Sequence, residues 1–223
     1  PTSLQNHQVL ALDAEQSFLV KIPPTNGELN TIAVDRMVST TEHHYMYQEK
    51  AVYHGYLAEN LRSYLKGIEV DEVESRIMSW VSSYYPDVIL TSFKYENLYD
   101  LQQPLELTFQ FSQHKDYAVN KLPVFTERYV MDFAHAPRRS WDFEIENSFR
   151  IKSTTRKSGK GIKFVNVNQK VDDELTRWQV HSDKSKINFE AEVFATQKPA
   201  KDYTKLVNLS KQGILALEAA VKN

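Results

Sequence analysis

Apolar residues recur at two spacings along this chain, and each spacing predicts a different secondary structure. Between residues 71 and 85 they recur at helical spacing, so they share one face of a helix. These residues are Val73, Ile77, Trp80, Val81 and Tyr84. Asp71 is expected to cap this helix and Pro86 to end it. A shorter helix is expected over residues 58–66, with Gly67 as its C-terminal cap.

Elsewhere apolar and polar residues alternate, which is typical of strands with one buried face. The clearest alternation places Leu105, Leu107, Phe109 and Phe111 on one side of a strand. Residues 31–40 and 43–56 are also predicted strands. On the first of these, Ile32, Val34 and Arg36 share a face.

The second half of the chain reads as further strands followed by a helix. Residues 148–155 and 162–167 predict a hairpin, because a glycine-containing turn lies between them. Residues 177–181 and 187–196 predict another antiparallel pair. Residues 203–217 predict a C-terminal helix, which Gly213 weakens by about 1 kcal/mol.

Together these elements predict an α+β, β-rich fold in two parts. Residues 1–115 form a mixed α/β segment with a helix pair near residues 58–85. Residues 116–223 form an antiparallel β-sandwich-like domain with a C-terminal helix.

Composition agrees with an ordinary folded protein. The hydrophobic fraction is 41% and the charged fraction 25%, while aromatic residues reach 12% and favour β-structure. The net charge of −2 gives no general attraction to nucleic acid. No apolar run approaches the ~20 residues of a membrane span. We therefore expect neither a nucleic-acid partner nor a membrane span.

The chain contains no cysteine, which excludes disulfides, thiolate nucleophiles and cysteine-based zinc sites. The sequence also lacks a nucleophile elbow, a P-loop, a dinucleotide-binding glycine motif, an H-E-x-x-H motif and an EF-hand loop. We therefore assign no catalytic residue, metal ligand or cofactor. The prediction leans toward a chain without enzymatic activity of its own.

Two groups of residues are candidate sites. The first is an aromatic cleft that could hold a peptide or a carbohydrate. Its residues are Tyr45, Tyr47, Tyr53, Trp80 and Tyr84.

The second candidate is a polar site that could bind an anion or orient a carboxylate. Its residues are His54, Asp132, His135, Arg138 and Arg139. The favoured interpretation of the two arginines is instead that they lie on a polar loop and pair with Glu144 or Glu146.

Two further interpretations are less favoured. His44, His54 and a nearby carboxylate, Glu49 or Glu59, could bind a metal, although the favoured explanation is a set of surface and half-buried histidines in a tyrosine-rich sheet. A basic segment could meet nucleic acid, although lysines commonly line solvated hairpins. Its residues are Lys152, Arg156, Lys157, Lys160 and Lys163.

Several stretches along the chain form a recognisable series: Ala11–Asp13 with Lys21–Thr25, Tyr53–Tyr56 entering a helix, Glu96–Leu107, Leu122–Phe125 and Pro199–Tyr203. This series resembles the C-terminal region of bacterial transglutaminase-like proteins, in which domains of unknown function flank a papain-like cysteine core. The resemblance is a diffuse pattern over most of the chain.

The resemblance implies a non-catalytic accessory region that supports an upstream transglutaminase-like domain or presents a peptide or cell-wall substrate to it. It also implies a bacterial, periplasmic or secreted setting, with Pro1 as a boundary within a longer polypeptide. The family nucleophile is a cysteine, and this chain has none, so no catalytic residue carries over. The alternative is a stand-alone periplasmic binding protein that uses the aromatic cleft.

Overall fold

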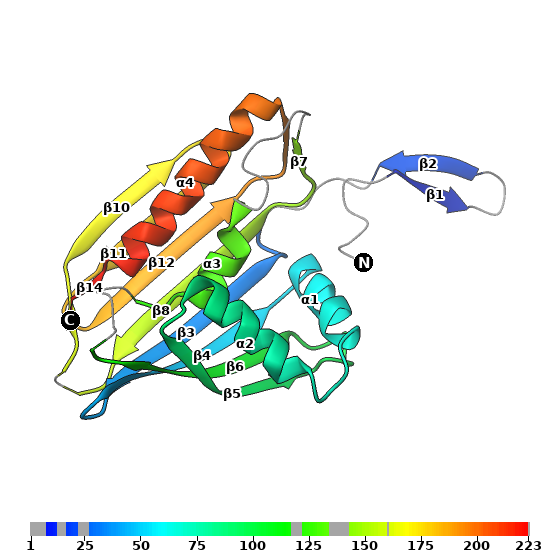
Figure 1. Ribbon diagram of the computed structural model, residues 1–223. Helices are drawn as coiled ribbons and strands as arrows, with labels where there is room; N and C mark the ends of the chain where they lie inside the picture. The colour runs from blue at the N-terminus through cyan, green and yellow to red at the C-terminus, as the bar shows by residue number, and fades with distance from the viewer. Residues whose placement is uncertain are drawn as a thin grey trace.

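The computed structural model describes residues 8–12, 17–21, 27–116, 122–133, 143–159 and 161–222 (Figure 1). Its body is one eight-stranded sheet. In spatial order the strands are β10 (Val167–Asp172), β11 (Thr176–Ser182), β12 (Lys186–Val193), β8 (Phe149–Lys157), β3 (Thr31–Thr40), β4 (His44–Tyr53), β6 (Leu105–His114) and β5 (Val88–Glu96). The helices are α1 (Tyr56–Lys66), α2 (Val73–Tyr84), α3 (Phe125–Met131) and α4 (Ala200–Glu218).

Three small two-stranded sheets complete the described part of the chain. They pair β1 (Gln8–Leu12) with β2 (Ser17–Lys21), β7 (Phe143–Ile145) with β13 (Thr196–Lys198), and β9 (Lys163–Phe164) with β14 (Val221–Lys222). In Figure 1 the β1–β2 hairpin projects away from the large sheet.

The four helices lie on one face of the large sheet, and the opposite face meets solvent (Figure 1). The strands alternate accordingly. On β3, Ile32 and Val34 are buried, whereas Ala33, Asp35 and Met37 between and beyond them are exposed. The hydrophobic core therefore lies between the sheet and the helices, and the sheet is solvated on its other face.

The two predicted parts of the chain meet within this one sheet. Every neighbouring pair of strands is antiparallel except β3 and β8, which run parallel. Because β3 precedes residue 115 and β8 follows it, the sheet does not divide at that boundary. The α+β, β-rich class with a C-terminal helix is confirmed. Helix α4, rather than a second sheet, packs on β10, β11 and β12.

The local predictions succeed for the periodic elements and fail at some of their connections. Both helices of the pair and the β11–β12 pair are confirmed. The Asp71 cap is wrong, because α2 begins after Glu72 with no side-chain cap. The hairpin of residues 148–155 with 162–167 is also wrong, because β8 pairs with β3 and β12. Helix α3 was not predicted.

Gly213, expected only to weaken the last helix, allows α4 to pack closely on β11. A Cβ atom at this position would lie 3.1 Å from the indole ring of Trp178. The indole N–H in turn donates to the carbonyl oxygen of Leu209, at 2.9 Å. Glycine thus lowers the helix propensity at this position but allows the helix to pack closely against a buried ring.

The entry into α1 depends on a second glycine. Gly55 has a φ of 66°, and a Cβ atom there would overlap Asn30 Oδ1 and the carbonyl oxygen of Leu29. Asn30 is fully buried; it accepts a hydrogen bond from the Tyr56 N–H at 3.1 Å and donates one to the Ser148 carbonyl at 3.0 Å. This one side chain therefore ties the start of α1 to the segment that leads into β8.

Replacing Gly55 by alanine should lower the free energy of unfolding by about 3 kcal/mol, because strain at positive φ adds to the overlap with Asn30. Urea denaturation measures the change. Gly159→Ala is the matched control, since Gly159 also has positive φ but nothing lies within 4 Å of its added Cβ. It should cost only about 1 kcal/mol. Equal losses in the two variants would contradict the role given to Asn30.

Candidate functional site

The strongest cluster of charged groups lies in the core. Arg36 on β3, Glu49 on β4 and Glu127 on α3 are all fully buried. The guanidinium donates to Glu49 Oε2 through Nε at 2.9 Å and through Nη2 at 2.5 Å. It also donates to Glu127 Oε2 through Nη2 at 2.7 Å, and to Thr155 Oγ1 of β8 through Nη1 at 3.1 Å.

Two carboxylates share the one cation in this cluster. Burial raises the pKa of Glu49 above its ordinary value, and the negative charge of Glu127 raises it further, whereas Arg36 and the Thr126 hydroxyl oppose the shift. Burial alone would lower the pKa of Arg36, but Glu127 and Glu49 hold it above its ordinary value. Because these groups satisfy one another away from solvent, the cluster joins three strands to α3 rather than facing a substrate.

The predicted aromatic cleft is not formed by the five residues proposed for it. Tyr45, Tyr47 and Tyr53 all lie on the helix-covered face of β4 and are buried in the core. Tyr47 donates its hydroxyl hydrogen bond to Gln113 Oε1 on the neighbouring strand, at 3.0 Å. Only the two α2 residues, Trp80 and Tyr84, are partly exposed.

Trp80 instead belongs to an aromatic cluster that spans three helices. Its ring centroid lies 4.6 Å from that of Tyr64 on α1 and 5.0 Å from that of Tyr129 on α3. Tyr64 and Tyr129 are each more than a third exposed. The cluster of Tyr64, Trp80 and Tyr129 is therefore an aromatic surface on the helical layer.

The predicted polar site is only partly described. His135, Arg138 and Arg139 lie outside the described residues. Asp132 directly follows α3. Burial raises the pKa of Tyr84, and the negative charge of Asp132 raises it further, to about 12. His54 is exposed, and its backbone N–H donates to the Thr31 carbonyl at 2.8 Å.

The metal alternative gains no support in the described residues. His44 begins β4 and His54 follows its last residue, so the two lie at opposite ends of the strand. Glu49 is engaged in the buried cluster. No group of three His, Cys, Asp or Glu side chains among the described residues could hold a metal ion.

In the basic segment, Lys152, Arg156 and Lys157 lie on β8 and Lys163 lies on β9, while Lys160 lies outside the described residues. Arg156 pairs with Asp35 at 2.5 Å and Lys152 with Glu190 at 3.5 Å, both on the solvated face of the sheet. Trp178, which could have offered a stacking surface beside them, is buried under α4.

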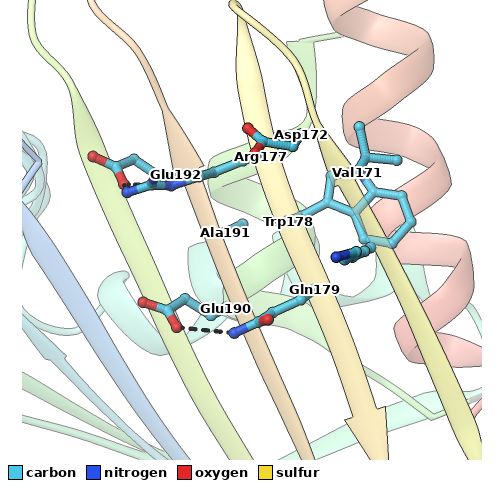
Figure 2. A pocket seen from close by; sticks show the side chains of 9 residues that line it. Val171, Asp172, Arg177, Trp178, Gln179, Glu190, Ala191 and Glu192 are labelled. Carbon is cyan, nitrogen blue, oxygen red and sulfur yellow. Dashed lines mark hydrogen bonds and ion pairs between the residues drawn. The ribbon is translucent and has the colours of Figure 1, made fainter.

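A shallow pocket of about 300 Å³ lies along β10, β11 and β12, as Figure 2 shows. Arg177 meets Glu192 across it at 2.5 Å, and Gln179 donates to Glu190 at 3.3 Å. These polar side chains pair across adjacent strands, so the pocket is a ladder of cross-strand contacts on the solvated face.

The β5–β6 loop, residues 97–104, is held rigidly against α1. Arg62, only 5% exposed, donates to the carbonyl oxygens of Asn97 at 3.2 Å, Asp100 at 3.0 Å and Gln103 at 2.6 Å. Asn97 adopts a φ of 62°, and its amide donates to the Pro104 carbonyl at 3.0 Å.

This braced loop presents apolar side chains to solvent at its tip. Tyr99 is 75% exposed and Leu101 is 68% exposed. Leu98, the residue before Tyr99, is buried. Lys66 of α1 lies over the Tyr99 ring, with its ammonium nitrogen 5.0 Å from the centroid. The sequence contained these residues within a stretch of family resemblance, but no local pattern showed that Arg62 would hold them.

Comparison with known proteins adds no assignment: no family model, no curated protein and no solved structure matches this chain. Among the described residues, none of the helices has the length and apolar character needed to cross a membrane.

The charge cluster makes stability depend on pH. Because the folded-state pKa of Glu49 lies above its ordinary value of 4.5, its contribution is complete below that value and is lost as pH rises through the folded pKa. The free energy of unfolding should fall as pH rises from 4.5 to the folded-state pKa of Glu49, by at most about 1.4 kcal/mol per unit. Glu49→Gln, which mimics the protonated carboxyl, should remove this component of the slope.

Urea titrations of both proteins across this pH range measure the difference, with the exposed Glu69→Gln as control. The control should keep the wild-type slope. Parallel curves for wild type and Glu49→Gln would show that Glu49 ionises alike in the folded and unfolded chains.

Proposed function

We propose that this chain is a non-catalytic interaction region of a larger bacterial transglutaminase-like protein, where it supports the papain-like cysteine domain or presents substrate to it. The braced loop of residues 97–104 is the observation that supports this proposal. The family and its periplasmic or secreted setting rest on the sequence resemblance alone.

The loop combines two properties that favour protein binding. Its tip exposes a tyrosine, a residue type enriched at interface hot spots, and a leucine, whose burial in a partner would remove apolar surface from water. Its backbone is already immobilised by Arg62, so little conformational entropy remains to be lost on docking.

The partner that fits this surface is a folded domain with an apolar pocket. Tyr99 would enter the pocket with its ring, while Lys66 beside it would favour a carboxylate at the pocket rim. The proposed occupant is the transglutaminase-like domain of the same protein.

A second candidate function, binding of a peptide or a carbohydrate, is favoured by the aromatic cluster of Tyr64, Trp80 and Tyr129. Partly exposed rings on three adjacent helices could stack against a sugar or an apolar side chain. The rings stack mainly on one another, however, so they offer less free ring face than an open platform would.

Site-specific photo-crosslinking tests the docking loop. A photoreactive phenylalanine analogue at position 99, in the protein expressed in its native cells, should crosslink to one defined segment of a transglutaminase-like domain. The same analogue at Val70, which is equally exposed but lies outside the loop, should not. Crosslinks at position 99 that are absent, or as scattered as those at position 70, would contradict the proposal.

Tyr99→Ser with Leu101→Ser should abolish the defined crosslink when the probe is moved to position 102, without changing the melting temperature. A stable double variant that keeps the crosslink would show that the apolar tip does not bind the partner.

A further inference from the structure

The edge of the large sheet at β10 can accept a further strand. β10 is the first strand in the spatial order of the sheet, and none of the described strands pairs with its outer side (Figure 1). Its residues pair with β11 without a register shift, whereas β5 at the opposite edge has a shift between Leu90 and Ser92. Such a bulge commonly protects an edge against pairing with another chain. The regular backbone of β10 does not have this protection.

Alternate residues of β10 direct their backbone groups outward. The Asp173 N–H, just after the strand, donates to the Thr176 carbonyl oxygen of the next strand at 3.1 Å. At the other end, the Val167 N–H donates to the hydroxyl oxygen of Ser182 on β11 at 2.9 Å. Because the bonding direction alternates along an antiparallel strand, the odd-numbered residues face β11 and the even-numbered residues face away. The outward N–H and C=O groups within the strand belong to Asn168, Lys170 and Asp172.

Two of these residues carry opposite charges on the same face of the sheet. Lys170 and Asp172 are both exposed, and Val171 between them packs on the core side. An antiparallel pair of two β10 strands with its two-fold axis at Val171 places the lysine of each copy opposite the aspartate of the other. Each such pair also exchanges two backbone hydrogen bonds, because both residues direct their N–H and C=O groups outward.

The charges select this register among those that align the outward backbone groups. An axis at Lys170 or at Asp172 would place two like charges directly opposite each other, which destabilises a strand pair. An axis at Gln169 would place the lysine opposite Asn168 and leave the aspartate beyond the paired residues. The axis at Val171 is thus the one that gives two ion pairs.

The helix above this edge leaves room for a second copy. Helix α4 packs on β10, β11 and β12, and β11 is the middle strand of the three. With strands about 4.8 Å apart, the α4 axis lies about 7 Å from the two-fold axis, so the two α4 helices are about 14 Å apart. Packed helices approach to about 8–10 Å, so these helices do not clash.

We propose that two copies of this chain associate through β10, as an antiparallel strand pair centred on Val171, and so form one continuous sheet. The paired segment is short and its ion pairs are exposed, so the dimer is weak, with a dissociation constant between about 0.1 and 1 mM. The docking loop connects β5 and β6 at the opposite edge, so this association is independent of the proposed function.

Dilution of the isotopically labelled chain, followed by backbone NMR, tests the proposal. Between about 1 mM and 0.02 mM, the amide resonances of Lys170 and Asp172 should shift along a monomer–dimer curve. Lys170→Asp and Asp172→Lys should each weaken the association at least about tenfold, because like charges then face each other. Lys94→Asp, an exposed charge change on β5, is the matched control and should leave the dissociation constant unchanged.

Mixing the two charge variants gives the sharpest result. Unlabelled Asp172→Lys protein, added to labelled Lys170→Asp protein, should restore the shifts on β10 with about the wild-type affinity. In the mixed dimer, every acidic side chain of one variant faces a lysine of the other. Circular dichroism confirms the fold of each variant.

Three results would overturn the proposal. The first is a wild-type chain whose β10 resonances do not change on dilution from 1 mM. The second is unchanged self-association of the Lys170→Asp protein, which would assign the contact to another surface or register. The third is a mixture of the two variants that associates no better than either variant alone.

Discussion

The fold depends on a buried guanidinium shared by two carboxylates. Arg36 lies directly opposite Glu49 on one neighbouring strand and directly opposite Thr155 on the other. Its hydrogen bonds to both residues therefore require the correct register on both sides of β3. A slip by one residue would turn the charge to the solvated face and leave its partners buried without it. Removing one member of such a cluster typically costs about 3–5 kcal/mol.

The same cluster fixes the helical layer. Glu127 anchors α3 over the centre of the sheet, where Phe125 packs edge-on against Phe109 with ring centroids 5.6 Å apart. Arg128 on the same helix pairs with the buried Glu218 of α4 at 2.6 Å. Glu218 also accepts a hydrogen bond at 2.8 Å from the hydroxyl of Tyr85, the C-cap residue of α2. Three helices are thus joined to one another by charged or polar contacts beneath the surface.

Sequence periodicity predicted the elements that depend on neighbours along the chain. The helices α1, α2 and α4, and strands such as β6, follow from apolar spacing alone. The alternation on β3 even placed Arg36 on the face of Ile32 and Val34, which is the buried face. Its partner Glu127 could not be found this way, because it lies 91 positions away on a helix of only seven residues.

The failures share one cause, which is contact between distant segments. Nothing local shows that β8 joins β3 rather than the residues after its own turn, and that pairing merges the two predicted parts. The candidate sites show the same limit. Alternation on β4 explains why its three tyrosines are buried, but the brace of Arg62 on residues 97–104 required the tertiary structure.

This bracing gives the protein its proposed surface, since an immobilised loop can present apolar side chains at little entropic cost. Because this loop connects β5 and β6, the surface depends on a sheet that stays whole.

Native-state hydrogen exchange at increasing denaturant tests most directly whether the large sheet unfolds as one cooperative unit. If the Arg36 cluster makes one cooperative unit, the slowest amides of β6 and of β12 should open with the same free energy and the same dependence on denaturant. A lower opening free energy for β12, with its own weaker dependence on denaturant, would show two independently unfolding parts and contradict the account.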